Sequence, residues 1–332
     1  MSDLNSKLKL SIIIVSWNVQ ALLQKCLESI ERFKGDLDLE VIIVDNNSSD
    51  DTQNNLNKML AYFRGRENMQ NGFQVIFNDE NVGFARGNNI ALRQARGDYI
   101  LFLNPDTEII GNALQTMISY MENNDCAVVG PKLLNPDGSI QNSVRKFPTL
   151  TSQILVLTKL HNFIPQVEPL KAYFQLDFDY NKTQEVDQLM GAALMVSREI
   201  IDNINKSKQK TRLVFFLGRE IIQVDFFDSK YKRIFEEVDL QYRVKKSGYK
   251  IVYLPSVEII HHKGASFTKT RIFRKQLDFN QGMRRWFLKH KPIWQYFILL
   301  LFQPVSWLIT LLQLFFSKLG DPVRKKFKKR EL

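Results

Sequence analysis

The sequence predicts an α/β fold in which helices cover a doubly wound, mixed sheet. Three observations predict it: short β-branched runs that end at polar residues, a stretch with helical spacing between the first two runs, and carboxylates where runs end. Strands buried on both faces read as continuous apolar runs. Because ligands of such sheets bind beyond the carboxyl ends of the strands, residues at these ends are candidates for a functional site.

The predicted elements alternate along the first third of the chain. The expected strands cover residues 10–18, 40–50, 73–77 and 99–107. Between the first two, residues 21–33 place apolar side chains at spacings of one, three and four, which predicts a helix with one apolar face. A glycine-containing loop at 81–89 and a helix at 89–95 precede the fourth strand. One edge then presents Asn18, Asp45 and Asp106, although the last alone is equally compatible with an Asn-Pro-Asp turn.

Several motifs follow one another in a fixed order. They are SIIIVSWN (11–18), VDNNSSDD (44–51), NVGFARGNN (81–89), LFLNPDTEI (101–109), VDQLMGAALMVSRE (186–199), FEEVDL (235–240), KSGYKI (246–251) and HHKGAS (261–266). In this order they resemble the inverting family-2 glycosyltransferases with a GT-A fold, especially the rhamnosyltransferase-like branch. The resemblance implies a Rossmann-like nucleotide-sugar half at 1–135 and an acceptor half with the catalytic base at 136–270. We expect membrane-associating helices and a basic tail at 271–332.

Sugar transfer from a nucleotide needs groups that bind the nucleotide, a cation that offsets charge on the leaving diphosphate, and a carboxylate that takes the acceptor proton. The resemblance makes Asp45 the nucleotide reader, whereas the residues alone also allow it to cap the next helix, in competition with Ser48 and Ser49. The two glycines of the 81–89 loop would let backbone amides approach a ligand. The full donor-binding set is expected to be Ser16, Asn18, Asp45, Asn47, Gly83, Arg86, Asn88 and Asn104.

The expected metal ligands are Asp106 and, by the resemblance, His261, with Mg²⁺ or Mn²⁺ as the cofactor. Asn104 stands where many GT-A enzymes have the first acid of an Asp-x-Asp motif. One carboxylate together with diphosphate oxygens still suffices for Mg²⁺. Without the resemblance, a histidine after an Ile-Ile run is more often structural, and His262 is the neighbouring alternative.

The expected catalytic acids are Glu236, Glu237 and Asp239, with Glu237 as the base by resemblance. As a pattern, three acids in four residues also fit a solvated first helical turn, where carboxylates face the helix dipole favourably. Like charges packed together raise at least one pKa, as a general base requires. Gly191 and Ala192 are expected on the acceptor side.

The chain has 332 residues and a formal charge of +11, from 46 Lys and Arg against 35 Asp and Glu. Six of the cations crowd into residues 324–330, directly after the uncharged, aromatic-rich stretch 292–317. That arrangement predicts an anionic membrane surface as partner, not nucleic acid. Because Gln303-Pro304 interrupts the stretch, two helices in the headgroup region fit at least as well as one span, and a soluble helical tail is a third possibility.

Two segments are expected to lack regular structure. Residues 146–180 are rich in Pro, Phe and Leu, and they either lie on the acceptor side of the site or form a packed connector. Residues 206–212 fit an exposed loop. The N-terminal nine residues show no secretory signal, so we expect the cytoplasmic face of the cell membrane.

The function predicted from the sequence is transfer of a sugar from a nucleotide-sugar donor, with dTDP-rhamnose the best guess, to a lipid-linked or cell-surface glycan acceptor. A nucleotidyltransferase and a non-catalytic membrane-associated binding module are the alternatives.

Overall fold

The computed structural model describes residues 9–64, 72–213, 225–231, 234–262 and 272–318, and it confirms the α/β class. Four parallel strands form one half of a mixed sheet: β3 (Phe73–Phe77), β2 (Leu39–Asp45), β1 (Leu10–Ser16) and β4 (Tyr99–Leu103). The sheet continues through β10 (Ala193–Ser197), β6 (Val128–Leu134), β11 (Ile251–His261) and β5 (Thr107–Ile109). Because β10 runs antiparallel to both β4 and β6, the sheet as a whole is mixed.

Two short pairings complete the strands. Strand β8 (Gln184–Glu185) pairs with β11, and β7 (Val144–Arg145) forms a separate two-stranded sheet with β9 (Gln188–Leu189). This small sheet lies directly before residues 190–192, so it positions the segment that the sequence assigns to the acceptor side.

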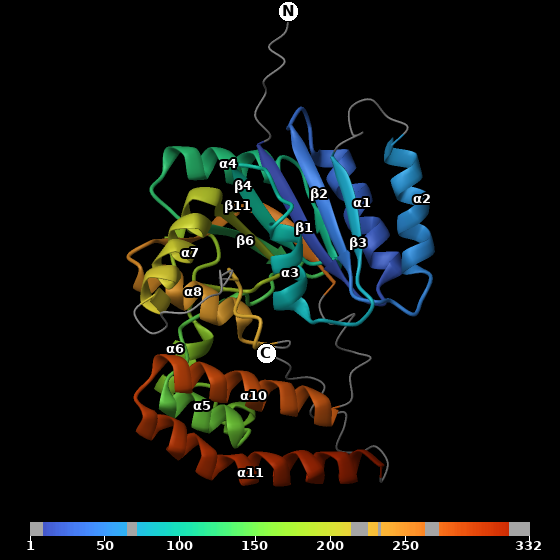
Figure 1. Cartoon of the computed structure of the whole chain (residues 1–332). Helices are drawn as coiled ribbons and strands as arrows, with labels where there is room; N and C mark the ends of the chain where they lie inside the picture. Colours follow the sequence, from blue (N-terminus) through green and yellow to red (C-terminus); the bar gives the residue numbers. More distant parts are fainter. Residues whose placement is uncertain (1–8, 65–71, 214–224, 232–233, 263–271, 319–332) are drawn as a thin grey trace, which may run out of the picture.

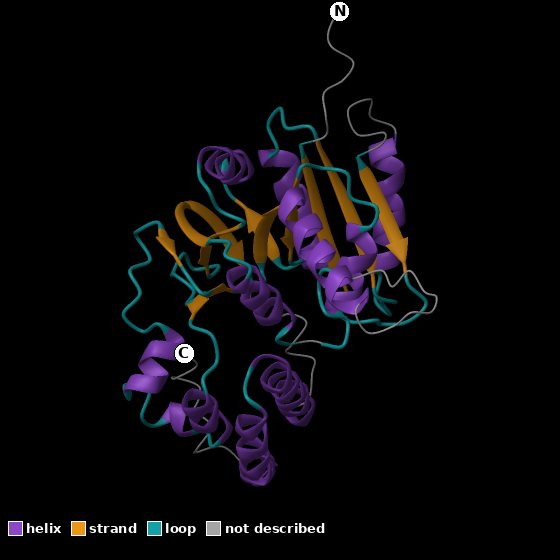
Figure 2. Ribbon diagram, turned by 60° about the vertical axis from the view of Figure 1, so that its left-hand side comes forward, coloured by secondary structure: helices purple, strands orange, loops and turns teal. Residues whose placement is uncertain are grey.

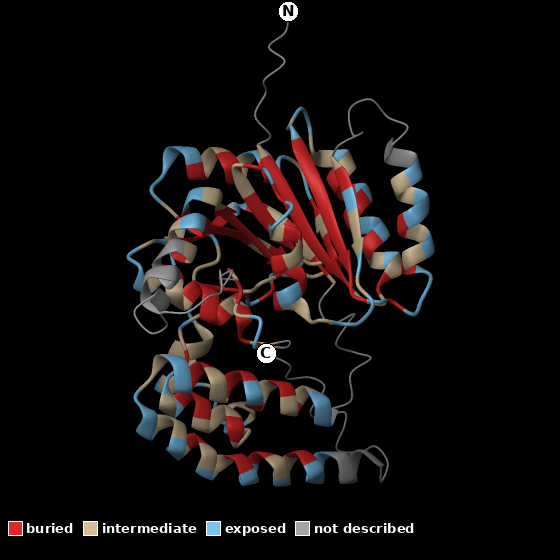
Figure 3. Cartoon of the chain, in the orientation of Figure 1, coloured by how far each residue is buried: buried red, intermediate tan, exposed pale blue. Residues whose placement is uncertain are grey.

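Helices cover both faces of the sheet (Figures 1 and 2). They are α1 (Gln20–Phe33), α2 (Thr52–Arg64), α3 (Phe84–Leu92), α4 (Ala113–Asn123), α7 (Arg198–Leu213) and α8 (Glu236–Lys246). Alternate residues of a strand point to opposite faces: Ile12 and Ile14 of β1 join one core cluster, and Ile13 and Val15 join the other. Burial on both faces explains the uninterrupted apolar runs, and Figure 3 shows these strands as the most buried part of the molecule.

A helical layer lies apart from the sheet (Figure 1). It contains α5 (Leu150–Leu157), a short 3₁₀ turn (Leu160–Asn162), α6 (Glu168–Phe174), α10 (Ile272–His290) and α11 (Ile293–Lys318). A third apolar cluster holds it together, with Leu157, Trp286 and Leu299 each essentially without exposed surface. Phe235 and Val238 belong to the same cluster, so the layer is joined to the start of α8.

Helix α11 is exposed along an apolar face and buried along a partly polar one. Leu301 is 75% exposed and Leu308 58%, whereas Ser306 and Thr310 are fully buried. Within the described residues, this helix alone is long and apolar enough over Ile293–Gln313 to cross a membrane. Figure 3 shows buried and exposed residues alternating along it.

Four local expectations are wrong. Helix α3 begins at Phe84, so most of the 81–89 loop is helical, and the Cβ of any residue replacing Gly87 would lie 2.9 Å from a Val15 methyl group. Residues 146–180 contain α5 and α6, the first begun by a capping box between Thr149 and Ser152.

The other two corrections also concern helices. Residues 206–212 continue α7, in keeping with the good helix propensity of Lys, Gln and Arg. Pro304 lies inside α11 and does not separate two helices, so the structure has one apolar C-terminal helix. A proline removes one backbone donor, but α11 is packed on both sides of it: Leu299 before it lies in the third apolar cluster, and Trp307 after it packs on Phe273 of α10. The basic tail at 324–330 and the residues 263–266 lie outside the described residues.

Candidate active site

The ends of β1 and β2 meet as the sequence predicts. Ser16 Oγ donates to Asp45 Oδ1 at 2.9 Å, the backbone N–H of Asn18 donates to Ser48 Oγ at 2.9 Å, and Asn18 Oδ1 accepts from the Ser49 N–H at 2.6 Å. Asn18 has a φ of 55°, in the left-handed region that Asn tolerates better than most residues. These bonds tie the two loops into one wall at the edge of the sheet.

Asp45 is fully buried, and its carboxylate is occupied by protein donors. Oδ1 accepts from Ser16 and Ser48, and Oδ2 accepts from the Ser48 N–H at 2.9 Å and from Gln53 Nε2 at 3.0 Å. Of the two roles that the sequence allowed, this geometry favours shaping the loop before α2 over direct contact with a base.

The remaining donor-side residues differ in accessibility. Asn47 and Arg86 are exposed, whereas Asn88 is buried and donates to the Phe84 carbonyl of its own helix. Gly83 precedes α3 with a φ of 86°, a conformation that glycine adopts without a Cβ clash. Only Arg86 of these offers an exposed cation for a phosphate.

Asp106 and His261 meet at the far end of the same edge, because β5 and β11 pair Thr107 with His261. His261 Nε2 lies 3.4 Å from Asp106 Oδ1, and both residues are buried. The backbone N–H of His262 donates to the Asp106 carbonyl at 2.8 Å. His262 itself turns to Glu108, at 2.5 Å, so His261 is the histidine that faces Asp106.

These two residues fit a divalent cation by the chemistry of their donor set. A carboxylate oxygen and a ring nitrogen face each other, and no described side chain donates a hydrogen bond to the Asp106 carboxylate. The described residues hold no group of three or more His, Cys, Asp or Glu that could bind a metal ion. Oxygens from water and substrate would therefore have to complete the coordination, as Mg²⁺ commonly allows.

Residues 191 and 192 connect this edge to the acidic cluster. The Ala192 carbonyl accepts from the Asn104 N–H at 2.8 Å, two residues before Asp106. A Cβ on Gly191 would lie 3.3 Å from Cβ and Cγ of Glu237, so a larger residue at 191 would crowd the Glu237 side chain. Gln241 fixes α8 to the same segment by bonding both backbone groups of Leu189, at 2.7 and 2.9 Å.

Glu236 and Glu237 open α8 in a poorly solvated environment. Burial, together with the negative charge of Glu237, raises the pKa of Glu236 well above its ordinary value. Burial also raises the pKa of Glu237, against the opposing effect of backbone amides at the helix start and of the Arg145 charge. Each side chain has a buried Oε2 without a hydrogen-bond partner among the described residues. A carboxylate of this kind can accept a proton readily.

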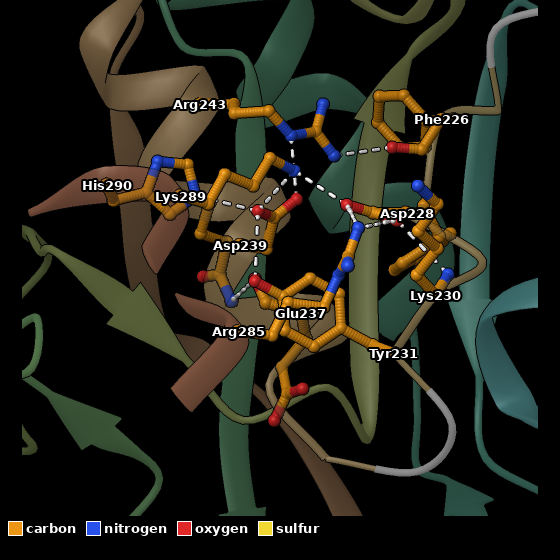
Figure 4. A network of polar contacts seen from close by, with 12 residues as sticks. Phe226, Asp228, Lys230, Tyr231, Glu237, Asp239, Arg243, Arg285, Lys289 and His290 are labelled. Carbon is orange, nitrogen blue, oxygen red and sulfur yellow. Dashed lines mark hydrogen bonds and ion pairs between the residues drawn. The ribbon is translucent and has the colours of Figure 1, made fainter. Parts of the chain in front are cut away.

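Asp239 is a different kind of acid (Figure 4). It is fully buried, and its carboxylate lies 2.7 Å from His290 Nε2, 2.6 Å from Lys289 Nζ and 2.8 Å from Arg243 Nε. Burial alone would raise the pKa of Asp239, but the His290 hydrogen bond and the charges of Arg243 and Lys289 hold that pKa far below its usual range. Asp239 therefore stays ionised and joins α8 to α10.

A second acid extends this connection. Asp228 accepts from Arg285 at 2.9 and 3.0 Å and from Lys289 at 2.9 Å, so Lys289 bridges both acids. Sequence reasoning missed Arg285, Lys289 and His290, because it placed residues after 271 in the membrane-associating part. It also missed Gln141, which contacts His261. The spacing of Arg285, Lys289 and His290, which places them on one face of α10, was the only feature of the local sequence that could have indicated their shared role.

The fold is a mixed α/β sheet whose polar residues gather beyond the carboxyl ends of its strands, where proteins of this class bind their ligands. A family model described as Glycosyl transferase family 2 matches residues 11–187, and the chain belongs to that family. The structure of GalNAc-T7 with UDP, GalNAc and Mn²⁺ has a TM-score of 0.52, with 13% identity, over 77% of this chain and 44% of that chain. This likeness confirms the expected GT-A type of fold.

Curated relatives are similar at modest identity. Rhamnosyltransferase WbbL of Escherichia coli is 26% identical over 76% of this chain and 82% of its own length. N-acetylglucosaminyl-diphospho-decaprenol L-rhamnosyltransferase of Mycobacterium tuberculosis is 28% identical over 51% of this chain and 48% of its own length. GalNAc(5)-diNAcBac-PP-undecaprenol beta-1,3-glucosyltransferase of Campylobacter jejuni is 35% identical over 40% of each chain. The chain thus spans less than half the length of the last two.

Proposed function

We propose that this chain is an inverting glycosyltransferase that moves a sugar from a nucleotide-sugar to a lipid-linked or polysaccharide acceptor. One observation carries the proposal: Gly191 packs against Glu237 while Ala192 bonds Asn104, which connects a poorly solvated carboxylate to the strand end that holds Asp106 and His261. In this proposal residues 1–135 form the donor half and 136–270 the acceptor half.

Glu237 is the base in this mechanism. Its carboxylate takes the proton of the acceptor hydroxyl as that oxygen forms a bond to the anomeric carbon. The bond from this carbon to the diphosphate oxygen breaks on the opposite face, and the electron pair leaves with the nucleoside diphosphate. The raised pKa of Glu237 favours proton capture, and Arg86 offers an exposed cation to the phosphates.

Asp106 and His261 would hold Mg²⁺ or Mn²⁺. When bound, such a cation offsets the negative charge that develops on the departing diphosphate. Their facing lone pairs support this role. Further support comes from GalNAc-T7, a protein of similar fold whose structure was solved with UDP and Mn²⁺.

Rhamnose, carried as dTDP-rhamnose, is the donor that we propose. The rhamnosyltransferase activities by which the E. coli and M. tuberculosis relatives are named support it, whereas the C. jejuni relative is a glucosyltransferase. Both relatives with lipid acceptors act on isoprenoid diphosphates by name, which supports an acceptor of that class.

The membrane assignment rests on α11. A surface helix in water normally turns its apolar side inward. Helix α11 buries Gln303, Ser306 and Thr310, and it exposes four of its leucines, Leu301, Leu308, Leu311 and Leu312. An apolar face next to lipid and a basic segment at 324–330 together make a two-part anchor. We therefore place the enzyme in-plane at the cytoplasmic face of the cell membrane.

The test is to incubate the full chain with a panel of nucleotide-sugars and a polyprenyl-diphosphate-sugar acceptor, with Mg²⁺ or Mn²⁺, and to identify both products. Release of nucleoside diphosphate together with an elongated lipid would support the proposal, and dTDP-rhamnose should be the preferred donor. Release of pyrophosphate would favour a nucleotidyltransferase instead. If no donor is consumed, the chain would be assigned as a non-catalytic binding module instead of an enzyme.

The Asp106→Asn variant tests the proposed metal site in the same experiment. It keeps the size of the side chain but removes its charge, so transfer should be nearly lost and nucleoside diphosphate affinity should fall only when metal is present. Unchanged wild-type transfer after exhaustive chelation would contradict the metal assignment while leaving the transferase assignment intact.

A further inference from the structure

Gln141 lies between β6 and β7, is 4% exposed, and makes three polar contacts through its amide group. Its Nε2 donates to the His261 carbonyl at 2.6 Å and faces the Leu134 carbonyl at 3.4 Å. Its Oε1 lies 3.0 Å from His261 Nδ1. The side chain therefore touches both the backbone and the ring of the same histidine.

These contacts determine which way the amide points. A backbone carbonyl can only accept a hydrogen bond, so the NH₂ group of Gln141 must face Leu134 and His261. Its oxygen must then face the ring, and an amide oxygen can only accept. His261 Nδ1 therefore carries the proton, and in the neutral ring Nε2 keeps its lone pair.

That lone pair points toward a second acceptor. Nε2 lies 3.4 Å from Asp106 Oδ1, and with the proton on Nδ1 it cannot donate to the carboxylate. Two acceptors this close repel each other unless a cation, either a metal ion or a second proton on the ring, lies between or beside them. An ordinary structural His–Asp pair would instead carry its proton on Nε2.

We propose that Gln141 is a positioning residue that holds His261 in the Nδ1–H tautomer, so that Nε2 and the Asp106 carboxylate together present lone pairs to a divalent cation. This rests on the proposed metal-assisted transfer and adds a residue outside the motifs that predict it. Partners of this kind, which donate to or accept from a metal-bound histidine, typically change metal affinity about 10–100-fold when they are removed.

The first measurement is the tautomer of His261, by long-range ¹H–¹⁵N correlation in the full chain. The chain has only four histidines, so a His261→Gln variant assigns the signal. We expect Nδ1–H in the wild type without metal and a mixture of tautomers in Gln141→Leu. A wild-type ring protonated on Nε2 would overturn the proposal.

The second measurement is Mn²⁺ affinity in the presence of dTDP, by electron paramagnetic resonance. Gln141→Leu should bind Mn²⁺ about 10–100-fold more weakly, because the leucine side chain accepts no hydrogen bond from Nδ1–H. Gln276→Leu is the matched control: it removes another glutamine, 6% exposed, from α10 and should leave the affinity unchanged.

The outcomes separate the two proposals. If the wild type binds Mn²⁺ and Gln141→Leu, folded by its melting curve, binds it equally well, only the role of Gln141 is overturned. If the wild type binds no Mn²⁺ with dTDP, the metal assignment itself fails, and the role of Gln141 fails with it.

Discussion

Glu236 and Glu237 are adjacent in sequence but are placed for different purposes. Glu237 packs against Gly191, next to the Ala192 carbonyl that bonds Asn104, whereas Glu236 is 5% exposed. Keeping two carboxylates in one helical turn costs stability, because each charge is desolvated and they repel. The same burial gives Glu237 a pKa above that of an ordinary glutamate, which suits a base.

Replacing Glu237 by Gln should keep donor binding and lower kcat at least 10²-fold, in line with the roughly 10²–10⁴ contributed by a general base. In the wild type, kcat should fall on the acid side at a pH above the ordinary glutamate pKa, because protonated Glu237 cannot accept a proton. Steady-state kinetics between about pH 5 and 9 measure both. Loss of transfer in Glu236→Gln with normal kcat in Glu237→Gln would reassign the base to its neighbour.

Glu236→Gln should stabilise the fold at about pH 8 and have little effect at about pH 4. The folded-state pKa of Glu236 is raised, so the folded protein binds more protons than the unfolded one between the two pKa values, and stability falls as pH rises through that window. A difference of one between the folded and unfolded pKa values changes the free energy of unfolding by about 1.4 kcal/mol. We therefore expect Glu236→Gln to raise Tm by a few °C at about pH 8. Glu80→Gln, at an exposed site, is the control. Equal gains in Tm at both pH values would show that Glu236→Gln does not act by removing a buried charge.

At the scale of elements, α10 holds the start of α8 in place. Lys289 lies between Asp228 and Asp239, Arg285 bonds the first and His290 the second, so three side chains of one helix fix the segments on both sides of Glu237 (Figure 4). Breaking a buried ion pair by removing one partner is strongly destabilising, because the other charge is left unpaired.

Asp239→Asn should therefore lower the free energy of unfolding by about 3–5 kcal/mol, measured by urea denaturation, and lower kcat through misplacement of Glu237. Combining it with Lys289→Met should cost less than the sum of the two changes, since Asp239 and Lys289 contact each other directly and each single change already removes their contact. Asp125→Asn, in an exposed pair with Lys250, should leave the melting curve unchanged. A stable Asp239→Asn protein with lost transfer would instead make Asp239 part of the chemistry.

At the scale of the whole molecule, the helical layer packs on the start of α8 on one side and, among the described residues, is exposed on the other. Leu299 is fully buried with Trp286 and Leu157, so α11 is part of the folded unit, while Phe297, Leu301 and Leu308 are exposed on the other side. The layer therefore carries an apolar surface at a fixed place relative to Glu237.

Leu301→Gln with Leu308→Gln should reduce binding to vesicles containing phosphatidylglycerol at least several-fold without lowering Tm, measured by vesicle flotation and thermal melting. Ile140→Gln changes an equally apolar residue, 42% exposed, outside this layer and should leave binding intact. Leu299→Gln should instead lower Tm. Undiminished flotation of the double variant would show that the exposed face of α11 does not contact lipid.

The local sequence pattern was sufficient to predict the parallel strands and the polar residues at their ends. Residues 12–15 and 41–44 are buried on both faces, and such burial requires an unbroken apolar run that is visible in the sequence. The positions of Asn18, Asp45 and Asp106 could also be predicted, because polar turn residues end these apolar runs. The acidic cluster of α8 and the apolar stretch at 292–317 are likewise contiguous, so they needed no tertiary information.

The tertiary structure decided what these groups do. Whether Asp239 is a base or an anchor depends on His290 and Lys289, which lie on a different helix, and the ring of His261 is oriented by Gln141, 120 residues earlier. Burial of Ser306 and exposure of Leu301 depend on where α11 lies against α10. A sequence pattern reports periodicity along one element, whereas ion pairing, tautomer and burial are set by contacts between elements, and these exist only once the chain has folded.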